Sequence, residues 1–140
     1  MLYFAYGSNM NHSQMLSRCP DSKFLQSAYI EEYALVYDGY SKTRNGPVAN
    51  IVEELDSKVW GGLFEISDKD LRSLDRCEGY PRVYQRETLV IMGRDGKEYR
   101  AITYLRKDKL AGKPSESYRK VILQGAKDCG LPEEYIRGVL

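Results

Sequence analysis

Strand-like runs dominate this chain, and every predicted helix stands singly between them. Runs of apolar, β-branched and aromatic residues predict strands at 2–6, 24–37, 48–55, 58–66, 83–92 and 98–105. Capping residues and apolar stripes predict helices at 11–18, 68–78, 116–128 and from 132 onward. Single helices among successive strands are typical of an α+β fold built on a highly curved sheet or a small barrel, and the pattern alone fits both.

Turn-forming residues divide the predicted strands. Asp56-Ser57 and Asp95-Gly96 each predict a hairpin turn between the strands that flank them. Asp38-Gly39 and Asn45-Gly46-Pro47 predict turns around a polar loop. Gly61-Gly62 lies inside a predicted strand, where glycine marks a bulge or the close approach of another group.

Other stretches predict irregular backbone or a helix cap. The strand at 24–37 is expected to bend near Glu31-Glu32, and residues 106–115 are expected to form a polar connection. Either Asn9 or Asn11 can cap the first helix, because a short amide side chain accepts from the free N–H groups of the first turn.

Length and charge restrict the class of protein. A chain of 140 residues can build its own core, so we expect one domain over residues 1–140. The net charge of +1 gives no electrostatic basis for binding nucleic acid or an anionic membrane. The opening apolar run is too short for a signal peptide or a membrane span. The three cysteines are widely spaced, which predicts reduced thiols in a cytoplasmic protein.

The ionisable and aromatic residues narrow the chemistry further. His12 is the only histidine, so a zinc site would lack its usual ligands, and neither a metal nor a cofactor is expected. Tyrosine is over-used, at twelve residues against one tryptophan and three phenylalanines. Strand propensity accounts for most of these tyrosines, and some can line a polar pocket, because the ring is apolar and its tip is polar.

Glu78 is the first candidate for chemistry. It follows Leu74 by four residues and Leu71 by seven, so it projects from the same face of the predicted helix as these core leucines. It also lies in the last turn, just before Gly79. The electronegative helix end and an inward position both disfavour the ionised carboxylate, which predicts a raised pKa suited to proton transfer. In the alternative reading the helix end frays and Glu78 points to solvent.

The turn Tyr6-Gly7-Ser8-Asn9 is the second candidate. A buried strand that enters a helix through this turn presents free backbone N–H groups at the helix N-terminus, where anions such as carboxylates bind. Gly7 lets the backbone approach a ligand closely. Ser8 and Asn9 can add hydrogen bonds, or they can simply cap the helix with no ligand present.

Residues near Glu78 admit other readings. Asp75 can pair with Glu78, but an ion pair with a neighbouring arginine is the favoured interpretation. Cys77 has no histidine placed beside it by sequence, so it is expected to be a small packed thiol rather than a nucleophile. Arg82 and Arg86 are expected to belong to a solvated strand face rather than to a nucleic-acid surface.

Several motifs in order resemble the gamma-glutamylcyclotransferase family over almost the whole chain. They are the run 2–9 (LYFAYGSN), 59–64 (VWGGLF), 74–80 (LDRCEGY) with Tyr84 and Arg86 behind it, Ser117-Tyr118-Arg119-Lys120, Gly125-Ala126-Lys127 and 130–135 (GLPEEY). The resemblance implies a small mixed β-barrel with flanking helices. Met10 stands where the family often has leucine, and the chain stops without the C-terminal tail of some relatives.

The resemblance also implies an activity. The free α-amine of a gamma-glutamyl compound attacks its own γ-carbonyl, 5-oxoproline forms, and an amino acid or amine departs. It implies Glu78 as general acid/base, and a glutamyl-binding turn of Tyr6, Gly7, Ser8 and Asn9 preceded by Tyr3, Phe4 and Ala5. Tyr118 matches a substrate-contacting tyrosine. We therefore expect a small-molecule gamma-glutamyl substrate, no cofactor, no nucleic-acid or membrane partner, and a monomer or homodimer.

Two alternatives remain at this point. The leaving group can be an amine, as in an isopeptide fragment or an acylated antibiotic, because pocket shape beyond the glutamyl unit decides it. The chain can also be a non-catalytic binding module of the same fold.

Overall fold

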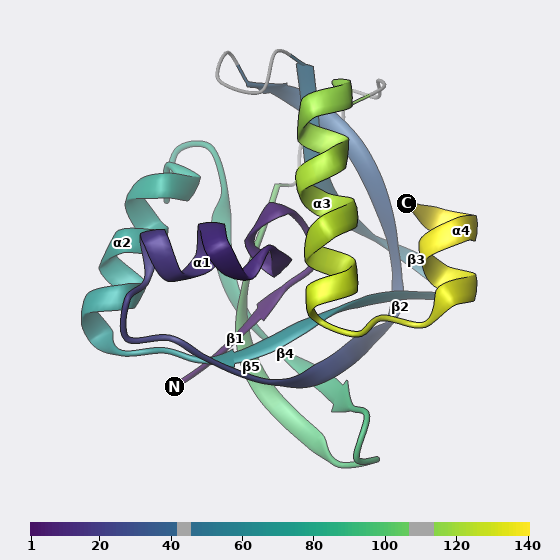
Figure 1. Cartoon of the computed structure of the whole chain (residues 1–140), viewed down its shortest axis with the longest axis horizontal. Coiled ribbons are helices and arrows are strands. Elements are labelled where there is room, and N and C mark those ends of the chain that lie inside the picture. The colour runs from purple at the N-terminus through teal and green to yellow at the C-terminus, as the bar shows by residue number, and fades with distance from the viewer. Residues whose placement is uncertain (42–45, 107–113) are drawn as a thin grey trace.

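The computed structural model describes residues 1–41, 46–106 and 114–140 and forms a closed five-stranded barrel flanked by helices (Figure 1). The strands are β1 (Leu2–Ala5), β2 (Lys23–Ser41), β3 (Gly46–Glu65), β4 (Gln85–Gly93) and β5 (Glu98–Leu105). The helices are the 3₁₀ turn η1 (Ser8–Met10), α1 (His12–Arg18), α2 (Asp68–Glu78), α3 (Glu116–Asp128) and α4 (Glu133–Val139). The order around the barrel is β1-β3-β2-β4-β5, and a parallel β5–β1 contact closes it, so the predicted α+β mixed barrel is confirmed.

The apolar residues of strand β1 lie where the barrel closes, between β3 and β5. The strand pairs antiparallel with β3 and parallel with β5, where Tyr3 lies opposite Ile102. Phe4 is fully buried. The predicted close approach at Gly61-Gly62 is confirmed, because a Cβ on Gly61 would lie 2.2 Å from the Ala5 carbonyl oxygen.

The hairpin predicted at Asp56-Ser57 is wrong. Residues 48–66 do not fold back on themselves, because both halves of β3 pair with the same long strand, β2: Tyr33 lies opposite Glu53, and Glu31 lies opposite Lys58. Asp56 does adopt a turn-like backbone, with a φ of 62°, but it does so inside a bulge of one continuous strand.

The predicted bend of β2 is confirmed. The β2–β3 register shifts between Glu31 and Tyr33, and Glu32 has a φ of 65°. The turn predicted at Asp38-Gly39 is wrong, because β2 continues through it. Of the next predicted turn, Asn45 lies outside the described residues, while Gly46 and Pro47 already belong to β3.

The helices follow their capping residues. Asn11, and not Asn9, caps α1 by accepting from the Gln14 N–H. The Ser67–Asp70 capping box opens α2, and Gly79 ends it with a φ of 66°, which suits a residue without a Cβ. Helix α3 has the predicted bounds. Helix α4 begins directly after the predicted start at Pro132, and its Tyr135 is buried.

The β4–β5 hairpin and its sequel complete the barrel. The turn at Asp95-Gly96 is confirmed, with a φ of 81° at Gly96. Arg106, expected in a polar connection, is instead buried and forms an ion pair with Asp38 of β2. The polar context of its neighbours gave no sign of this burial. Residues 107–113 of the predicted connection lie outside the described residues, and Ser115, its last residue, caps α3.

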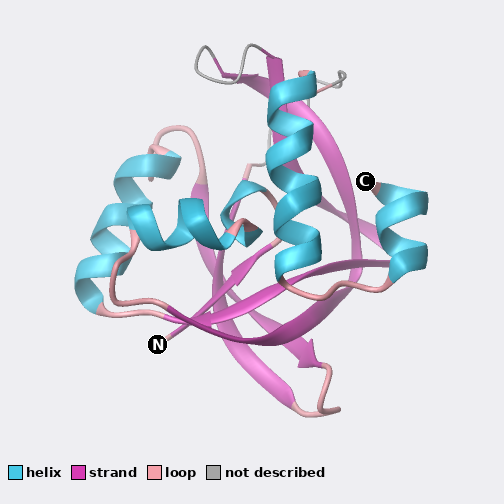
Figure 2. Ribbon diagram, in the orientation of Figure 1, coloured by secondary structure: helices cyan, strands magenta, loops and turns pink. Residues whose placement is uncertain are grey.

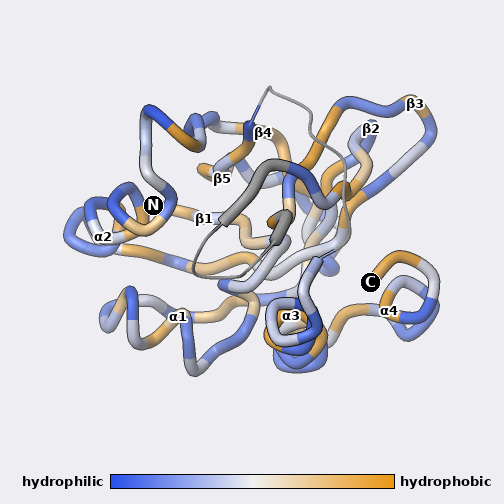
Figure 3. Tube along the Cα trace, turned by 90° about the horizontal axis from the view of Figure 1, so that it is seen from above, coloured by the Kyte–Doolittle hydropathy of each residue, from blue (hydrophilic) through white to orange (hydrophobic). Residues whose placement is uncertain are grey.

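The helices lie on the outside of the barrel, against its strands (Figure 2). Figure 3 shows α1, α3 and α4 side by side along one side of it, and the outward residues of α3 are polar. Helix α3 presses closely on the segment after β1, because a Cβ on Gly125 would lie 2.4 Å from the Asn11 nitrogen. Helix α3 therefore supports the turn that enters η1. No helix within residues 1–41, 46–106 and 114–140 combines the length and apolarity needed to cross a membrane.

We expect Gly61→Ala to lower the free energy of unfolding by about 1–3 kcal/mol, because the added methyl group would collide with the backbone of β1. Gly138→Ala is the matched control: a Cβ there meets nothing within 4 Å, so it should not lower the free energy of unfolding, and helix propensity should raise it by up to about 1 kcal/mol. Urea unfolding followed by circular dichroism measures both. Equal midpoints for wild type and Gly61→Ala would contradict the proposed tight β1–β3 contact.

Candidate active site

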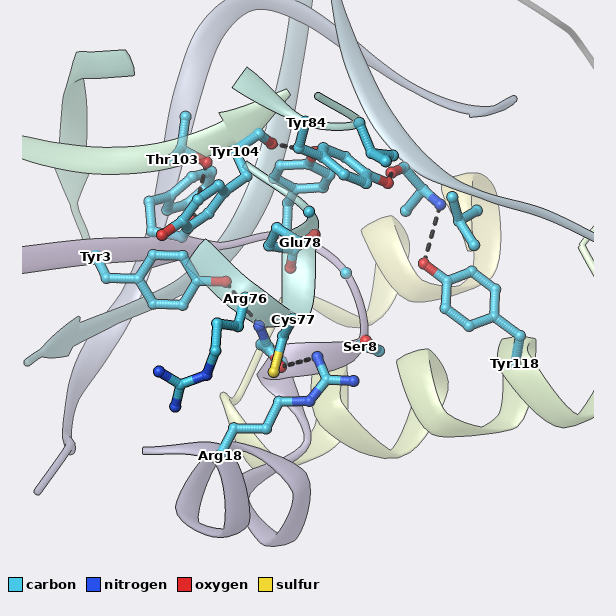
Figure 4. Close-up of a pocket in the computed structure, with 18 residues that line it drawn as sticks. Tyr3, Ser8, Arg18, Arg76, Cys77, Glu78, Tyr84, Thr103, Tyr104 and Tyr118 are labelled. Atoms are coloured by element: carbon cyan, nitrogen blue, oxygen red, sulfur yellow. Dashed lines mark hydrogen bonds between the residues drawn. The ribbon is translucent and has the colours of Figure 1, made fainter. Parts of the chain in front are cut away.

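A polar cavity of about 370 Å³ opens where the end of α2 faces the turn after β1 (Figure 4). Its volume is in the range typical of small-molecule sites. Predicted site residues that line it are Tyr3, Phe4, Tyr6, Gly7, Ser8, Asn9, Glu78 and Tyr118. Ala5 is buried in the barrel and is not among the lining residues. The two sequence candidates, the Tyr6–Asn9 turn and Glu78, therefore meet in one cavity.

Hydrogen bonds hold the turn after β1 in one shape. Gln14 of α1 donates from Nε2 to the Ser8 hydroxyl at 2.8 Å and to Asn9 Oδ1 at 2.9 Å. Arg18 donates to the same Asn9 oxygen at 3.0 Å, and Asn9 Nδ2 donates to the Tyr3 hydroxyl at 3.0 Å. Asn9 is buried, so it fixes the turn to α1 and β1 rather than capping α1.

The other side of the turn packs tightly at Gly7. A Cβ there would lie 3.3 Å from the Ala49 Cβ and 3.7 Å from the Tyr118 hydroxyl. Tyr118 is fixed in turn, because its hydroxyl accepts from the Ala49 N–H at 2.9 Å. The backbone of the turn thus lies directly against the cavity with little room for a side chain.

Glu78 is the last residue of α2 and is half-buried. Leu74, one turn earlier, is fully buried, as its spacing from Glu78 predicts. In Figure 4, Glu78 lies between Tyr84 and Tyr104 on one side and Arg76 and Cys77 on the other. The carboxylate therefore points into the cavity and not into open solvent.

Three tyrosine hydroxyls lie within the field of Glu78. Burial raises the pKa of Tyr3, Tyr6 and Tyr84 above the usual value for tyrosine, and the Glu78 charge raises the pKa of each further. These hydroxyls stay protonated at neutral pH and offer dipoles without added charge.

Tyr84 and Tyr104 were not assigned to the site by sequence reasoning, although the excess of tyrosine pointed to such a pocket. The Tyr84 hydroxyl donates to the Ala49 carbonyl at 2.7 Å, and the Tyr6 hydroxyl donates to the Tyr104 carbonyl at 2.5 Å. The Tyr104 hydroxyl donates to Asp75 at 2.6 Å. Burial, followed by this bond to Asp75, raises the pKa of Tyr104.

The structure also tests the predictions made for Asp75, Cys77, Arg82 and Arg86. Asp75 forms an ion pair with Arg86 at 2.5 Å, so the favoured arginine pairing is confirmed. Arg86 does more than belong to a solvated face, since its guanidinium also lies 4.3 Å from the centre of the Tyr80 ring; Arg82 is exposed. Cys77 is exposed and lines the cavity, so the expectation of a packed thiol is wrong. Burial raises the pKa of the Cys19 thiol to about 12, and all three cysteines are free.

Two cationic residues at the cavity, Arg18 and Arg76, were also missed. They come from the ends of different helices, so no local motif could join them. In the parts of the chain that the structure describes, no three His, Cys, Asp or Glu side chains converge to hold a metal ion. The chemistry available is that of one carboxylate, neutral tyrosine hydroxyls, backbone N–H groups and two guanidinium groups.

The barrel and its cavity define a class, a small α+β protein with a polar small-molecule site. The model of the AIG2-like family matches residues 58–139. A mouse gamma-glutamylcyclotransferase is 34% identical over 139 residues, covering 96% of this chain and 74% of the relative, and its human counterpart is 33% identical with the same coverage. A solved gamma-glutamyl cyclotransferase structure superposes with a TM-score of 0.94 at 30% identity, covering 100% of this chain and 88% of that one. The chain belongs to the AIG2-like gamma-glutamylcyclotransferase family.

We expect the cavity tyrosines to make the fold sensitive to alkali. Their folded-state pKa values are raised, so the stability they contribute is complete below the unfolded value of about 10 and is lost as pH rises toward the folded values. Titration of tyrosinate absorbance should show part of the twelve tyrosines ionising only on unfolding. A single transition near pH 10, with the protein still folded, would contradict this assignment.

Proposed function

We propose that this chain is a gamma-glutamylcyclotransferase, which converts a gamma-glutamyl compound to 5-oxoproline and a free amino acid or amine. Family membership supports the reaction. The observation that carries the chemistry is the position of Glu78, at the end of α2 and in the cavity that faces the Tyr6–Asn9 turn. We further propose a cytoplasmic enzyme whose single domain spans residues 1–140 and needs no cofactor.

Glu78 acts as the general acid/base. It takes a proton from the substrate's α-ammonium group, and the neutral amine nitrogen then attacks the γ-carbonyl carbon to form a C–N bond within the substrate. The original amide C–N bond breaks, and Glu78 returns the proton to the departing nitrogen, which would otherwise leave as a poor anion. The attacking nitrogen loses a second proton as it becomes the lactam N–H, and this proton follows the same route through Glu78, so the product leaves as an ammonium ion. No water is consumed and no side chain becomes covalently attached.

The Gly7-Ser8 segment binds the α-carboxylate of the glutamyl unit. Gly7 precedes η1 and Ser8 is its first residue, and the first amides of a helical turn lack intrahelical partners. Anchoring this carboxylate curls the substrate, so its amine meets its own carbonyl. Intramolecular reactions held in this way reach effective molarities on the order of 10⁵ M or more.

Tyr3 provides a hydrogen bond to the developing oxyanion. Its oxygen accepts from Asn9, and among the described residues no group accepts its own hydroxyl proton. The hydroxyls of Tyr6, Tyr84 and Tyr104, by contrast, already donate to protein oxygens. A fixed donor of this kind stabilises charge that forms only in the transition state.

We expect Glu78→Gln to lower 5-oxoproline release by at least about 100-fold, because the amide can neither take nor return the proton. The measurement is 5-oxoproline formed from a panel of gamma-glutamyl amino acids and amines. Glu98→Gln is the matched control, since Glu98 is exposed on β5 and lies outside the cavity. Both variants should keep the wild-type circular dichroism and melting temperature. Near-wild-type turnover by Glu78→Gln would contradict general acid/base catalysis by Glu78.

The same panel separates the alternatives. A binding module would bind gamma-glutamyl compounds without releasing 5-oxoproline. An enzyme for gamma-glutamyl amines would turn over those substrates faster than gamma-glutamyl amino acids.

A further inference from the structure

Two guanidinium groups stand at the cavity beside Glu78. Arg18 is the last residue of α1, and Arg76 lies in the last turn of α2, two residues before Glu78. The Ser73 hydroxyl of α2 donates to the Arg18 carbonyl at 2.7 Å, which ties the two helix ends together. Figure 4 shows both arginines on the Cys77 side of Glu78, opposite Tyr84. The fold thus brings two cations from separate helices to one side of the site.

These guanidinium groups have donors to spare. Arg18 is half-buried and donates from Nη1 to Asn9, while the Arg76 side chain makes no hydrogen bond or ion pair within the described part of the chain. Apart from tyrosine and cysteine, the titratable groups lining the cavity are these two arginines and Glu78. With Glu78 ionised, the lining carries one net positive charge, which suits an anionic ligand.

We propose that Arg76, assisted by Arg18, is a specificity-determining residue that binds the α-carboxylate of the departing amino acid. This inference rests on the proposed function. Glu78 must reach the departing nitrogen, and in an amino acid the carboxylate is only two bonds from that nitrogen. Arg76 lines the same cavity as Glu78 and comes from the same helix end, so its guanidinium is a cation that this carboxylate can meet.

Charge complementarity points the same way. A gamma-glutamyl amino acid carries two carboxylates and one ammonium, for a net charge of −1. A gamma-glutamyl amine without further ionisable groups carries one carboxylate and one ammonium, so its net charge is zero. The first carboxylate occupies the Gly7-Ser8 amides in the proposed mechanism. The second is left for the guanidinium groups, whose planar donor set suits a carboxylate.

The test uses two substrates that differ only in this carboxylate, gamma-glutamyl-alanine and gamma-glutamyl-ethylamine. Arg76→Gln should lower kcat/KM for gamma-glutamyl-alanine by about three- to tenfold, the size expected of a partly exposed charge pair, and leave gamma-glutamyl-ethylamine nearly unchanged. Arg72→Gln is the matched control, because Arg72 is exposed one turn earlier on α2 and does not line the cavity. It should change neither value.

Charge reversal extends the test. Arg76→Glu should lower kcat/KM for gamma-glutamyl-alanine further and raise it for the gamma-glutamyl derivative of ethylenediamine, whose far end is cationic. Arg76 is the better probe than Arg18, because Arg18 also holds Asn9. Equal losses on gamma-glutamyl-alanine and gamma-glutamyl-ethylamine in Arg76→Gln, or no loss on either, would overturn the carboxylate subsite.

Binding measurements separate this inference from the proposed function. Calorimetry on Glu78→Gln protein compares the Kd of gamma-glutamyl-alanine and gamma-glutamyl-ethylamine without turnover. A preference for the alanine compound that Arg76→Gln abolishes supports the subsite even if wild type releases no 5-oxoproline. Release of 5-oxoproline with equal Kd values and equal kcat/KM for the two compounds would leave the activity in place and reject the subsite.

Discussion

The buried ion pair between Arg106 and Asp38 fixes one end of the barrel. Arg106 follows β5 and Asp38 belongs to β2, and their side chains are only 4% and 3% exposed. Asn50 of β3 joins them, because its amide donates to the Arg106 carbonyl and accepts from the Arg106 N–H, each at 2.8 Å. Removing one partner of a buried pair typically costs about 3–5 kcal/mol, since the other charge is left without compensation. Three strands therefore depend on one cluster.

This cluster also determines the cavity wall. The Arg106 guanidinium lies 4.8 Å from the centre of the Tyr84 ring, and the Tyr84 hydroxyl reaches the Ala49 carbonyl. The Ala49 N–H then donates to Tyr118 on α3, and Ala49 packs against the position of Gly7. A continuous set of contacts thus runs from the barrel end to the glutamyl-binding turn proposed above. The shape of that turn is set by the barrel as a whole and not only by its own four residues.

Local periodicity was enough to find some parts of this structure and not others. The spacing of Leu74 and Glu78 is a property of one helix, so the inward carboxylate and the end at Gly79 could be predicted. Asp56 satisfies the local rules for a turn, but the partner of its strand lies elsewhere in the sequence, and pairing with β2 decides the outcome. The sequence around Arg106 predicts an exposed polar residue, because its buried partner, Asp38, is 68 positions away in the chain. The two arginines of the cavity and two of its five tyrosines, Tyr84 and Tyr104, were missed for the same reason, since only tertiary structure brings them together.

The distribution of charge around Glu78 supports the proton transfer proposed for it above. Several buried hydroxyls surround Glu78, but their raised pKa values keep them neutral, so they add donors without a competing base. The second nearby carboxylate, Asp75, is neutralised by Arg86 and holds Tyr104 in the wall. Glu78 is then the one lining carboxylate in the described part of the chain, and it faces cations on one side and neutral dipoles on the other. A zwitterionic substrate can satisfy both sides at once only when its ammonium group lies against Glu78, which is the arrangement that intramolecular attack requires.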